Sequence, residues 1–362
     1  MLLLRPLVRM TAYRRYPPPP YKRQLECYGS LKETDNRASK RSWRSTPDFK
    51  RGNYIMKFYG VDVSKNTLDI AFDGKAMQIE NNKKAIRSMI KMMPVGSIIA
   101  MESTNKYHFL IADMCHCAGM IVYVVNPRMT HHYREALNLR GHTDRLDAHT
   151  ICSFIKNHHA GLRRYEPKTA DQRRLQSLIR RRAKVVTVRV QLLQSIRDVK
   201  ELKSDIDAVL KRIDKMIAQI DILIDKQLEG NSDRDRLSTI KGVGPVVSAA
   251  LIADLQAGDF QSADAFVAFY GLDPVPNDSG KSKGKRRISK KGNRLGRSML
   301  YVAAFSATSS KAWKPVYEHI LAKGLSKVQA LVCLARKIAR TAWSIYKYKT
   351  VFQPEKLIVG LT

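Results

Sequence analysis

Between residues 57 and 125, the pattern of hydrophobic and polar positions predicts a small α/β domain. Short runs rich in β-branched and aromatic residues alternate with segments whose hydrophobic residues recur at helical spacing. The expected elements are two strands on either side of a turn at 64–66, a strand at 76–80, a helix at 83–93, a strand at 97–103, a helix at 107–118 and a strand at 121–125. Three adjacent strands, followed by strands that alternate with helices, indicate an α/β sheet with a mixed edge.

The middle of the chain, residues 168–229, contains no proline and predicts long helices. Its second half has hydrophobic residues at alternating intervals of four and three, as along a coiled coil: Ile206, Leu210, Ile213, Ile217, Ile220 and Ile224. The partner helix is either the preceding segment of the same chain or the same helix of another subunit. A run of arginines between 173 and 189 is either a phosphate-binding face or a solvated one.

A third pattern begins at residue 237, where two helical runs are interrupted by Gly242-Val243-Gly244. This spacing is typical of a helix-hairpin-helix, in which backbone N–H groups near Gly242 and Gly244 hold a DNA phosphate without reading sequence. An ordinary packing corner between two helices is the alternative, because two glycines alone are a weak signal. The chain beyond this point is expected to be mainly helical.

The excess of basic residues indicates that the protein binds nucleic acid. Lys and Arg number 65 against 32 for Asp and Glu, a formal net charge of +33, and a polyanion offsets such self-repulsion. A glycine- and serine-rich loop before the helix expected at Arg294 carries many of these cations, and we expect it to bind the phosphate backbone. Its candidate DNA contacts are Lys281, Lys283, Lys285, Arg286, Arg287, Lys290 and Lys291. No run of about 18 uncharged apolar residues occurs, so a membrane-spanning helix is not expected.

Four acids occupy related positions in the predicted N-terminal domain. Asp62 lies in the first strand and Glu102 near the end of the fourth. Asp144 and Asp147 are three residues apart in TDRLDAHTICSFI, and on a helix they share a face. If the first and fourth strands are neighbours, the four carboxylates meet in one cleft. Asp69, Asp73 and Asp113 have no such placement and are expected to be surface or turn residues.

Four carboxylates in one cleft repel each other unless divalent cations neutralise them. Oxygen ligands of this kind suit Mg²⁺ or Mn²⁺, and two such ions about 4 Å apart can support displacement at phosphorus. The loop sequence Asp278-Ser279-Gly280 adds a candidate nucleophile. A serine hydroxyl needs a metal or base to take its proton and cations to stabilise the phosphorane, and the surrounding lysines and arginines supply charge. Asp62, Glu102, Asp144, Asp147 and Ser279 are therefore the candidate catalytic residues.

The cysteines indicate the cellular compartment, and the first 55 residues have the composition of a leader segment. The five cysteines lack paired spacing, which excludes a disulfide framework or a zinc ribbon and favours a reducing cytoplasm. Residues 1–55 carry six prolines and no helix or strand period, and we expect a disordered basic leader. A dispensable segment upstream of the true start at Met56 is the preferred interpretation, and a nucleic-acid-binding arm or a transit peptide are the alternatives.

Several motifs resemble one known family. GVDVSKNTLDI, AMESTNKY, VVNP and LRGHTDRLDAHTI resemble the RuvC-like DEDD domain of IS110-family transposases, in the same order. GVGPVVSAAL, FYGLDPVPNDSGKSKGKRRISKKGN and GRSMLY resemble the transposase IS116/IS110/IS902 C-terminal domain. Together the two resemblances extend over residues 56–350.

The resemblance implies a ribonuclease H-like fold and a metal-binding tetrad at Asp62, Glu102, Asp144 and Asp147. It implies that a loop serine attacks DNA, and Ser279 matches its place, although Ser282 and Ser289 lie in the same loop. It also implies a covalent serine–DNA intermediate, a metal site and serine loop that meet across subunits of a dimer or tetramer, and a guide ("bridge") RNA. The setting would be the bacterial cytoplasm, at the nucleoid.

The expected organisation is a leader at 1–55, a RuvC-like domain at 56–160, a helical coiled-coil segment at 161–232, a C-terminal transposase domain at 233–350 and a tail at 351–362. The hypothesis is a DNA transposase that cuts and rejoins DNA by metal-assisted phosphoryl transfer. A resolvase-like metal nuclease that uses water is one rival. A non-catalytic DNA- or RNA-binding protein is the other, and the intact set of four acids argues against it.

Overall fold

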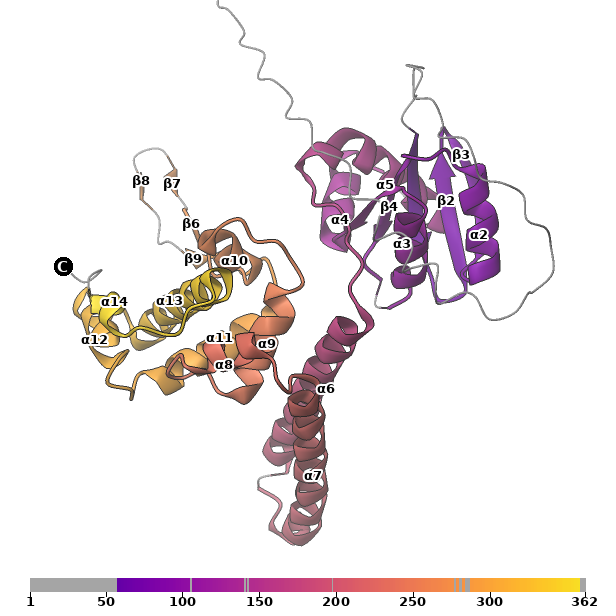
Figure 1. Cartoon of the computed structure of the whole chain (residues 1–362). Helices are drawn as coiled ribbons and strands as arrows, with labels where there is room; N and C mark the ends of the chain where they lie inside the picture. Colours follow the sequence, from indigo (N-terminus) through magenta and orange to yellow (C-terminus); the bar gives the residue numbers. More distant parts are fainter. Residues whose placement is uncertain are drawn as a thin grey trace, which may run out of the picture. The chain divides into compact units, whose positions relative to one another are not determined.

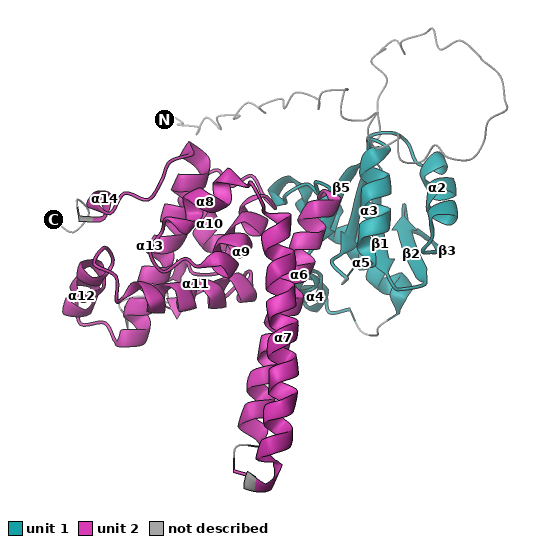
Figure 2. Cartoon of the chain, turned by 60° about the horizontal axis from the view of Figure 1, so that its bottom comes forward, with its two compact units in different colours: residues 1–167 teal, residues 168–362 magenta. Residues whose placement is uncertain are grey.

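The computed structural model describes residues 57–358 apart from 105, 140, 142, 197, 277, 280, 281 and 284–286 (Figure 1). The expected leader at 1–55 lies outside the described residues. The chain divides into two compact units, Met1–Pro167 and Lys168–Thr362 (Figure 2). The boundary lies seven residues beyond the expected limit at 160, and the helical middle belongs to the second unit.

The first unit is built on a five-stranded sheet of order β3-β2-β1-β4-β5. The strands β1, β2 and β3 pair antiparallel, whereas β4 pairs parallel with β1 and β5 parallel with β4. The predicted mixed α/β sheet is confirmed. The elements of this unit are β1 (Phe58–Val63), β2 (Thr67–Phe72), β3 (Lys75–Glu80), α2 (Lys83–Met92), β4 (Ile98–Glu102), α3 (His108–Cys117), β5 (Ile121–Val125), α4 (Pro127–Ala136), α5 (Asp144–His158) and the short η2 (His159–Gly161).

Alternate residues of β1, β4 and β5 supply two cores on opposite faces of the sheet. Odd-numbered residues of β1 and β4, such as Val61 and Ile99, pack with α2 and α3. Even-numbered residues of β4, such as Ile98 and Ala100, pack with Ile151 and Phe154 of α5. Asp62 and Glu102 share this even numbering, so they lie on the face that α5 covers.

The second unit is mostly helical, as the sequence predicts. It consists of α6 (Ala170–Ser195), η3 (Lys200–Leu202), α7 (Lys203–Gln227), α8 (Ser232–Ser238), α9 (Pro245–Leu255), α10 (Ala263–Phe269), four short strands, β6 (Pro274–Val275), β7 (Asp278–Ser279), β8 (Ser282–Lys283) and β9 (Arg287–Ile288), and then α11 (Arg294–Ala307), α12 (Lys314–Ala322), α13 (Lys327–Tyr348) and α14 (Glu355–Ile358). One core unites the base of α6 and α7 with α8–α13, and Trp313 and Phe266 are fully buried in it.

The coiled-coil partner of α7 is α6 of the same chain (Figure 2). Each residue of the predicted hydrophobic repeat, from Ile206 to Ile224, is buried or half-buried, while the positions between them are mostly exposed. Arg182 of α6 pairs with Asp221 of α7, and Arg189 pairs with Asp214 at 2.6 Å. The choice that the sequence left open is therefore an intrachain hairpin. Within the described residues, no helix is both long and apolar enough to span a membrane.

Candidate active site

The pairing of β1 with β4 brings Asp62 and Glu102 together. In this parallel pair Val61 lies opposite Met101, so Asp62 and Glu102 are the next residues in register. They lie at or next to the carboxyl ends of their strands, with both side chains on the same face of the sheet. The strand adjacency on which the sequence argument depends is present.

Helix α5 crosses the same face, and Gly60 allows it to come close. A Cβ added at Gly60 would lie 2.2 Å from the Cys152 backbone nitrogen and 2.3 Å from the Ala148 carbonyl oxygen. Asp62 is two residues further along β1 on this face, and the first turn of α5, which carries Asp144 and Asp147, lies one turn before Ala148. The backbone-to-backbone contact at Gly60 therefore positions the first turn of α5 beside Asp62.

The pKa of Asp62 shows that its carboxylate is close enough to Asp144 and Glu102 to be affected by their charges. The pKa of Asp62 is raised to about 6, first by burial, then by the negative charges of Asp144 and Glu102. A hydrogen bond from the Val63 backbone opposes part of this rise in pKa. A bound cation would remove the repulsion, and carboxylate oxygens are the ligands that Mg²⁺ and Mn²⁺ prefer. The donor set therefore fits a hard divalent cation.

Helix α4, which the sequence analysis did not predict, contacts two of the four acids. Thr130 Oγ1 donates to Glu102 Oε1, and Arg134 forms an ion pair with Asp147. Both α4 residues are buried, at 3% and 7% exposure. The available signal was Asn126-Pro127, a helix cap followed by proline at the first helical position.

The structure places Asp69 differently from the prediction. The prediction that it is a surface or turn residue is wrong, because it lies on β2 directly opposite Asp62 and is only 3% exposed. Residues directly opposite each other in an antiparallel pair share a face, and Gln78 Nε2 donates to both Asp69 oxygens, at 3.2 and 3.0 Å. Sequence spacing missed this fifth acid because its burial depends on α5 covering β2. By contrast, Asp73 is exposed in a turn and pairs with Lys57 at 3.6 Å.

The four acids are not drawn together as tightly as the ligands of a closed metal site. Among the described residues, the group whose ligand atoms all lie within 4.8 Å of one another is His131, His132 and Glu135 of α4, all exposed. The pKa of Glu135 is lowered by its hydrogen bond from His132 and the nearby His131. Of the four acids, Asp147 forms an ion pair with Arg134.

The candidate serine lies in a small β-ribbon between α10 and α11. Strands β6 and β9 form its stem, and β7 pairs with β8 so that Ser279 lies opposite Ser282. The stem is fastened to the core, because Lys290 N donates to Gly271 O at 3.0 Å and Asn293 N to Phe269 O at 2.9 Å. Ser289 is part of this stem, and its hydroxyl donates to Asp273 Oδ1.

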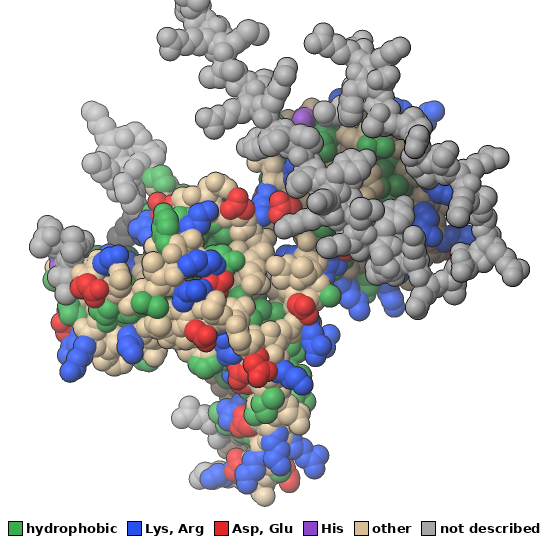
Figure 3. Space-filling model, viewed as in Figure 1, with side chains coloured by type: hydrophobic (Ala, Val, Ile, Leu, Met, Phe, Trp, Pro, Cys, Tyr) green, Lys and Arg blue, Asp and Glu red, His purple; other side chains and the backbone are tan. Residues whose placement is uncertain are grey.

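The cations of this loop are partly described. Arg287, Lys290 and Lys291 are exposed around the stem. Lys281, Lys285 and Arg286 lie outside the described residues, and for Lys283 only the backbone is described. On the face seen in Figure 3, basic and acidic side chains are interspersed along the α6–α7 hairpin, in keeping with the ion pairs of Arg182 and Arg189.

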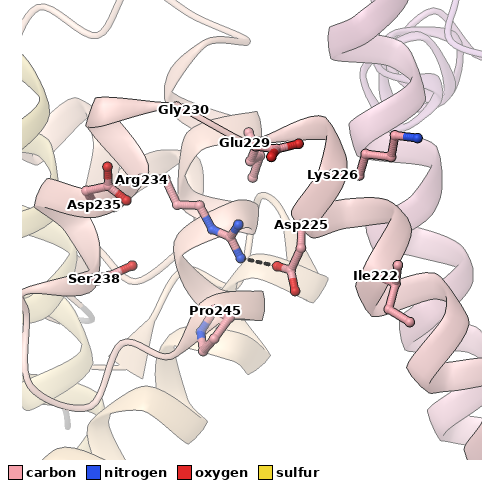
Figure 4. Close-up of a pocket in the computed structure, with 10 residues that line it drawn as sticks. Ile222, Asp225, Lys226, Glu229, Gly230, Arg234, Asp235, Ser238 and Pro245 are labelled. Carbon is pink, nitrogen blue, oxygen red and sulfur yellow. Dashed lines mark hydrogen bonds and ion pairs between the residues drawn. The ribbon is translucent and has the colours of Figure 1, made fainter.

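The two glycines between α8 and α9 have different surroundings. Gly242 has φ of +95°, and a Cβ there would lie 2.5 Å from the Ala303 carbonyl oxygen, so its α-carbon packs against α11. Gly244 faces open space. Beside it, Pro245 borders a hollow of about 610 Å³ that is lined by Asp225, Glu229 and Asp235 as well as Lys226 and Arg234, with Arg234 paired to Asp225 (Figure 4).

Two family models match this chain. The model described as "Transposase", which represents the DEDD domain of the IS110 group, matches residues 59–202, and the model "Transposase IS116/IS110/IS902 family" matches residues 234–318. The first match contains all four tetrad acids, and the second contains the glycine turn and the serine ribbon. The mixed sheet and the mostly helical second unit are consistent with a RuvC-like fold for the DEDD domain.

Curated relatives agree with the family models. A "Probable family 20 transposase" from Pseudomonas aeruginosa is 24% identical over 343 residues, covering 82% of this chain and 98% of that protein. The "Transposase for insertion sequence element IS1111A" from Coxiella burnetii is 23% identical, covering 80% of this chain and 89% of its own. An IS116 protein from Streptomyces clavuligerus is 29% identical over 160 residues, covering 42% of this chain and 39% of its own. With both family domains in order and relatives that align over nearly their whole length, the chain belongs to the IS110 family of transposases, enzymes that cut and rejoin DNA.

Proposed function

We propose that Asp62, Glu102, Asp144 and Asp147 bind Mg²⁺ or Mn²⁺ and form the catalytic centre for strand cleavage. The observation that carries this proposal is the parallel register of β1 and β4, which places Asp62 and Glu102 side by side on the face that α5 covers at Gly60. In keeping with this placement, burial and the neighbouring Asp144 and Glu102 raise the pKa of Asp62 to about 6. A carboxylate in such surroundings gains from a cation. When bound, the cation would supply charge stabilisation at phosphorus and help remove a proton from the attacking hydroxyl.

We further propose that Ser279 is the nucleophile. Its Oγ forms a bond to phosphorus while the bond from phosphorus to a DNA oxygen breaks, and the serine proton ends on the departing oxygen. The phosphoserine ester conserves the bond energy, so rejoining by the reverse reaction needs no ATP. The structure supports Ser279 over Ser289, because the Ser289 hydroxyl is engaged with Asp273 in the stem of the ribbon.

DNA binding would use the helix-hairpin-helix at α8–α9 and the cations of the serine loop. The surroundings of the two glycines favour Gly244 as the backbone contact, since Gly242 packs against α11. The family resemblance extends the proposal to a guide RNA, to a dimer or tetramer in which the metal site and the serine loop meet across subunits, and to action in the bacterial cytoplasm at the nucleoid.

The test is to trap the protein on a suicide DNA substrate from which the cut end escapes. The wild-type protein should form a covalent adduct, and mass spectrometry should place it at Ser279. Ser279→Ala should lose the adduct and recombination but still bind DNA, whereas Ser282→Ala and Ser289→Ala should keep the adduct. Attachment at another residue would refute the serine assignment, and cleavage without any adduct would favour the rival that uses water.

The metal part is tested separately. Asp62→Asn or Glu102→Gln should abolish strand cleavage with DNA binding nearly unchanged, and EDTA should do the same to the wild-type protein. Full cleavage by either variant, or in EDTA, would remove the metal site from the proposal.

A further inference from the structure

Helix α4 begins beside the end of β4 for a reason visible in the sequence. Val125 is paired with Glu102 at the end of the β4–β5 ladder. The next residue, Asn126, caps α4 by accepting from Arg128 N at 3.0 Å, and Pro127 starts the helix. The first turns of α4 therefore lie next to Glu102.

One face of α4 then meets the tetrad. Thr130 and Arg134 are four residues apart and so lie on the same side of the helix. Thr130 contacts Glu102 Oε1, and Arg134 Nη1 contacts Asp147 Oδ1. The Thr130 hydroxyl also lies 2.9 Å from the Pro127 carbonyl oxygen. A hydroxyl has one proton, and the charged acceptor forms the stronger hydrogen bond.

Each of these contacts takes a single oxygen of its carboxylate. With Oε1 of Glu102 and Oδ1 of Asp147 held by α4, the rotation of each carboxylate is restrained, and no hydrogen bond to its other oxygen is found among the described residues. Hydrogen bonds behind metal-binding carboxylates typically change metal affinity about 10- to 100-fold when they are removed.

We infer that Thr130 and Arg134 are positioning residues that orient Glu102 and Asp147 for the divalent cation. This inference rests on the proposed metal site. The ion pair also matters for Arg134 itself. Its Nη2 is buried with no hydrogen-bond partner among the described residues, so Asp147 is the acid that offsets the buried charge of Arg134. Helix α4 and the first turn of α5 are thus tied by one ion pair at the site.

A purely structural role for α4 predicts a loss of stability without a specific change in metal affinity. Thr130 separates the two cases, because Thr130→Val removes a hydroxyl without changing charge or shape, and Thr130→Ser restores the hydroxyl. The matched control is Thr150→Val, which removes another buried hydroxyl of the same unit, one that donates to the Leu146 carbonyl at 2.8 Å. For the arginine, Arg134→Lys keeps the charge but loses the planar donor geometry, and exposed Arg128→Lys on the same helix is its control.

The full-length protein is titrated with Mn²⁺, and electron paramagnetic resonance measures the concentration of free Mn²⁺. Thermal unfolding of each variant is measured separately without metal. The Mn²⁺ binding assigned to the four acids is the part of the total Mn²⁺ binding that Asp62→Asn eliminates. Thr130→Val and Arg134→Lys should each weaken it at least about tenfold, Thr130→Ser should stay within threefold of wild type, and both controls should match wild type.

Wild-type Mn²⁺ affinity in Thr130→Val, or equal weakening in Thr130→Val and Thr130→Ser, would overturn the role of Thr130. Wild-type affinity in Arg134→Lys would overturn that of Arg134. If Asp62→Asn binds Mn²⁺ as the wild type does, the proposed metal site itself fails and this inference falls with it. If only Asp62→Asn loses binding, the metal site stands and α4 has no positioning role.

Discussion

Replacing Gly60 by alanine should damage both the stability and the activity of this transposase, because α5 packs directly on the backbone of β1. The new methyl carbon would lie 2.2 Å from Cys152 N, 2.3 Å from Ala148 O and 2.8 Å from Cys152 Cα. All three are backbone atoms, so no side-chain rotation relieves the clash, and α5 must move by about 1 Å. Overpacking of this kind costs about 1–3 kcal/mol in the free energy of unfolding.

The same displacement moves Asp144 and Asp147 away from Asp62, since the first turn of α5 moves with the rest of the helix. A misplacement of about 1 Å at a catalytic centre can cost about 100-fold in rate. The assay combines urea unfolding with strand cleavage of a labelled DNA substrate at saturating Mg²⁺. Gly161→Ala in the same unit is the matched control, because its added Cβ meets nothing within 4 Å. A Gly60→Ala protein with wild-type stability and cleavage would refute the proposed packing of α5 on β1.

Two further predictions concern the second unit. Asp254 of α9 is 9% exposed, and its carboxylate accepts hydrogen bonds from Tyr270 Oη at 3.1 Å and from Asn293 Nδ2 at 2.9 Å. Burial raises the pKa of Asp254 to about 6, although the positive charges of Lys168 and Arg180 act to lower it. Because the folded pKa lies above the unfolded value, this group stabilises the fold at low pH, and the contribution is lost as pH rises through about 6. When the pH is lowered from 7 to 5, the unfolding free energy of the wild type should therefore rise by about 1 kcal/mol relative to that of Asp254→Asn. Urea unfolding measures both proteins, and a difference between their unfolding free energies that does not change with pH would contradict the shifted pKa. Gly242→Ala should lower the unfolding free energy by about 2–5 kcal/mol, because it combines a positive φ with a 2.5 Å approach to Ala303 O. Gly244→Ala, which faces open space, should stay within about 1 kcal/mol of wild type in the same urea titration, and equal losses in the two variants would count against the packing role of Gly242.

The pattern of side chains along the chain determined most elements of this protein, although not α4, and much of its candidate chemistry. The strand expected at 121–125 is β5, and the helix expected at 83–93 is α2. Alternation along a strand and spacing along a helix are local properties, which a sequence displays directly. The acids Asp62, Glu102, Asp144 and Asp147 could be selected for the same reason, because each lies at a definite point of a predicted element.

Tertiary structure decided everything that depends on which elements lie side by side. The helical repeat of α7 required a partner but did not identify it. The choice of α6 rests on contacts between residues far apart in the sequence, such as Arg182 and Asp221, which are 39 positions apart, and Arg189 and Asp214, which are 25 apart. Asp69 looked like a surface acid until the β1–β2 register placed it opposite Asp62, beneath α5. Thr130 and Arg134 carry no sign of their role, because it consists of contacts with carboxylates on β4 and α5. Spacing encodes the face of an element on which a residue lies, and packing alone decides what that face meets.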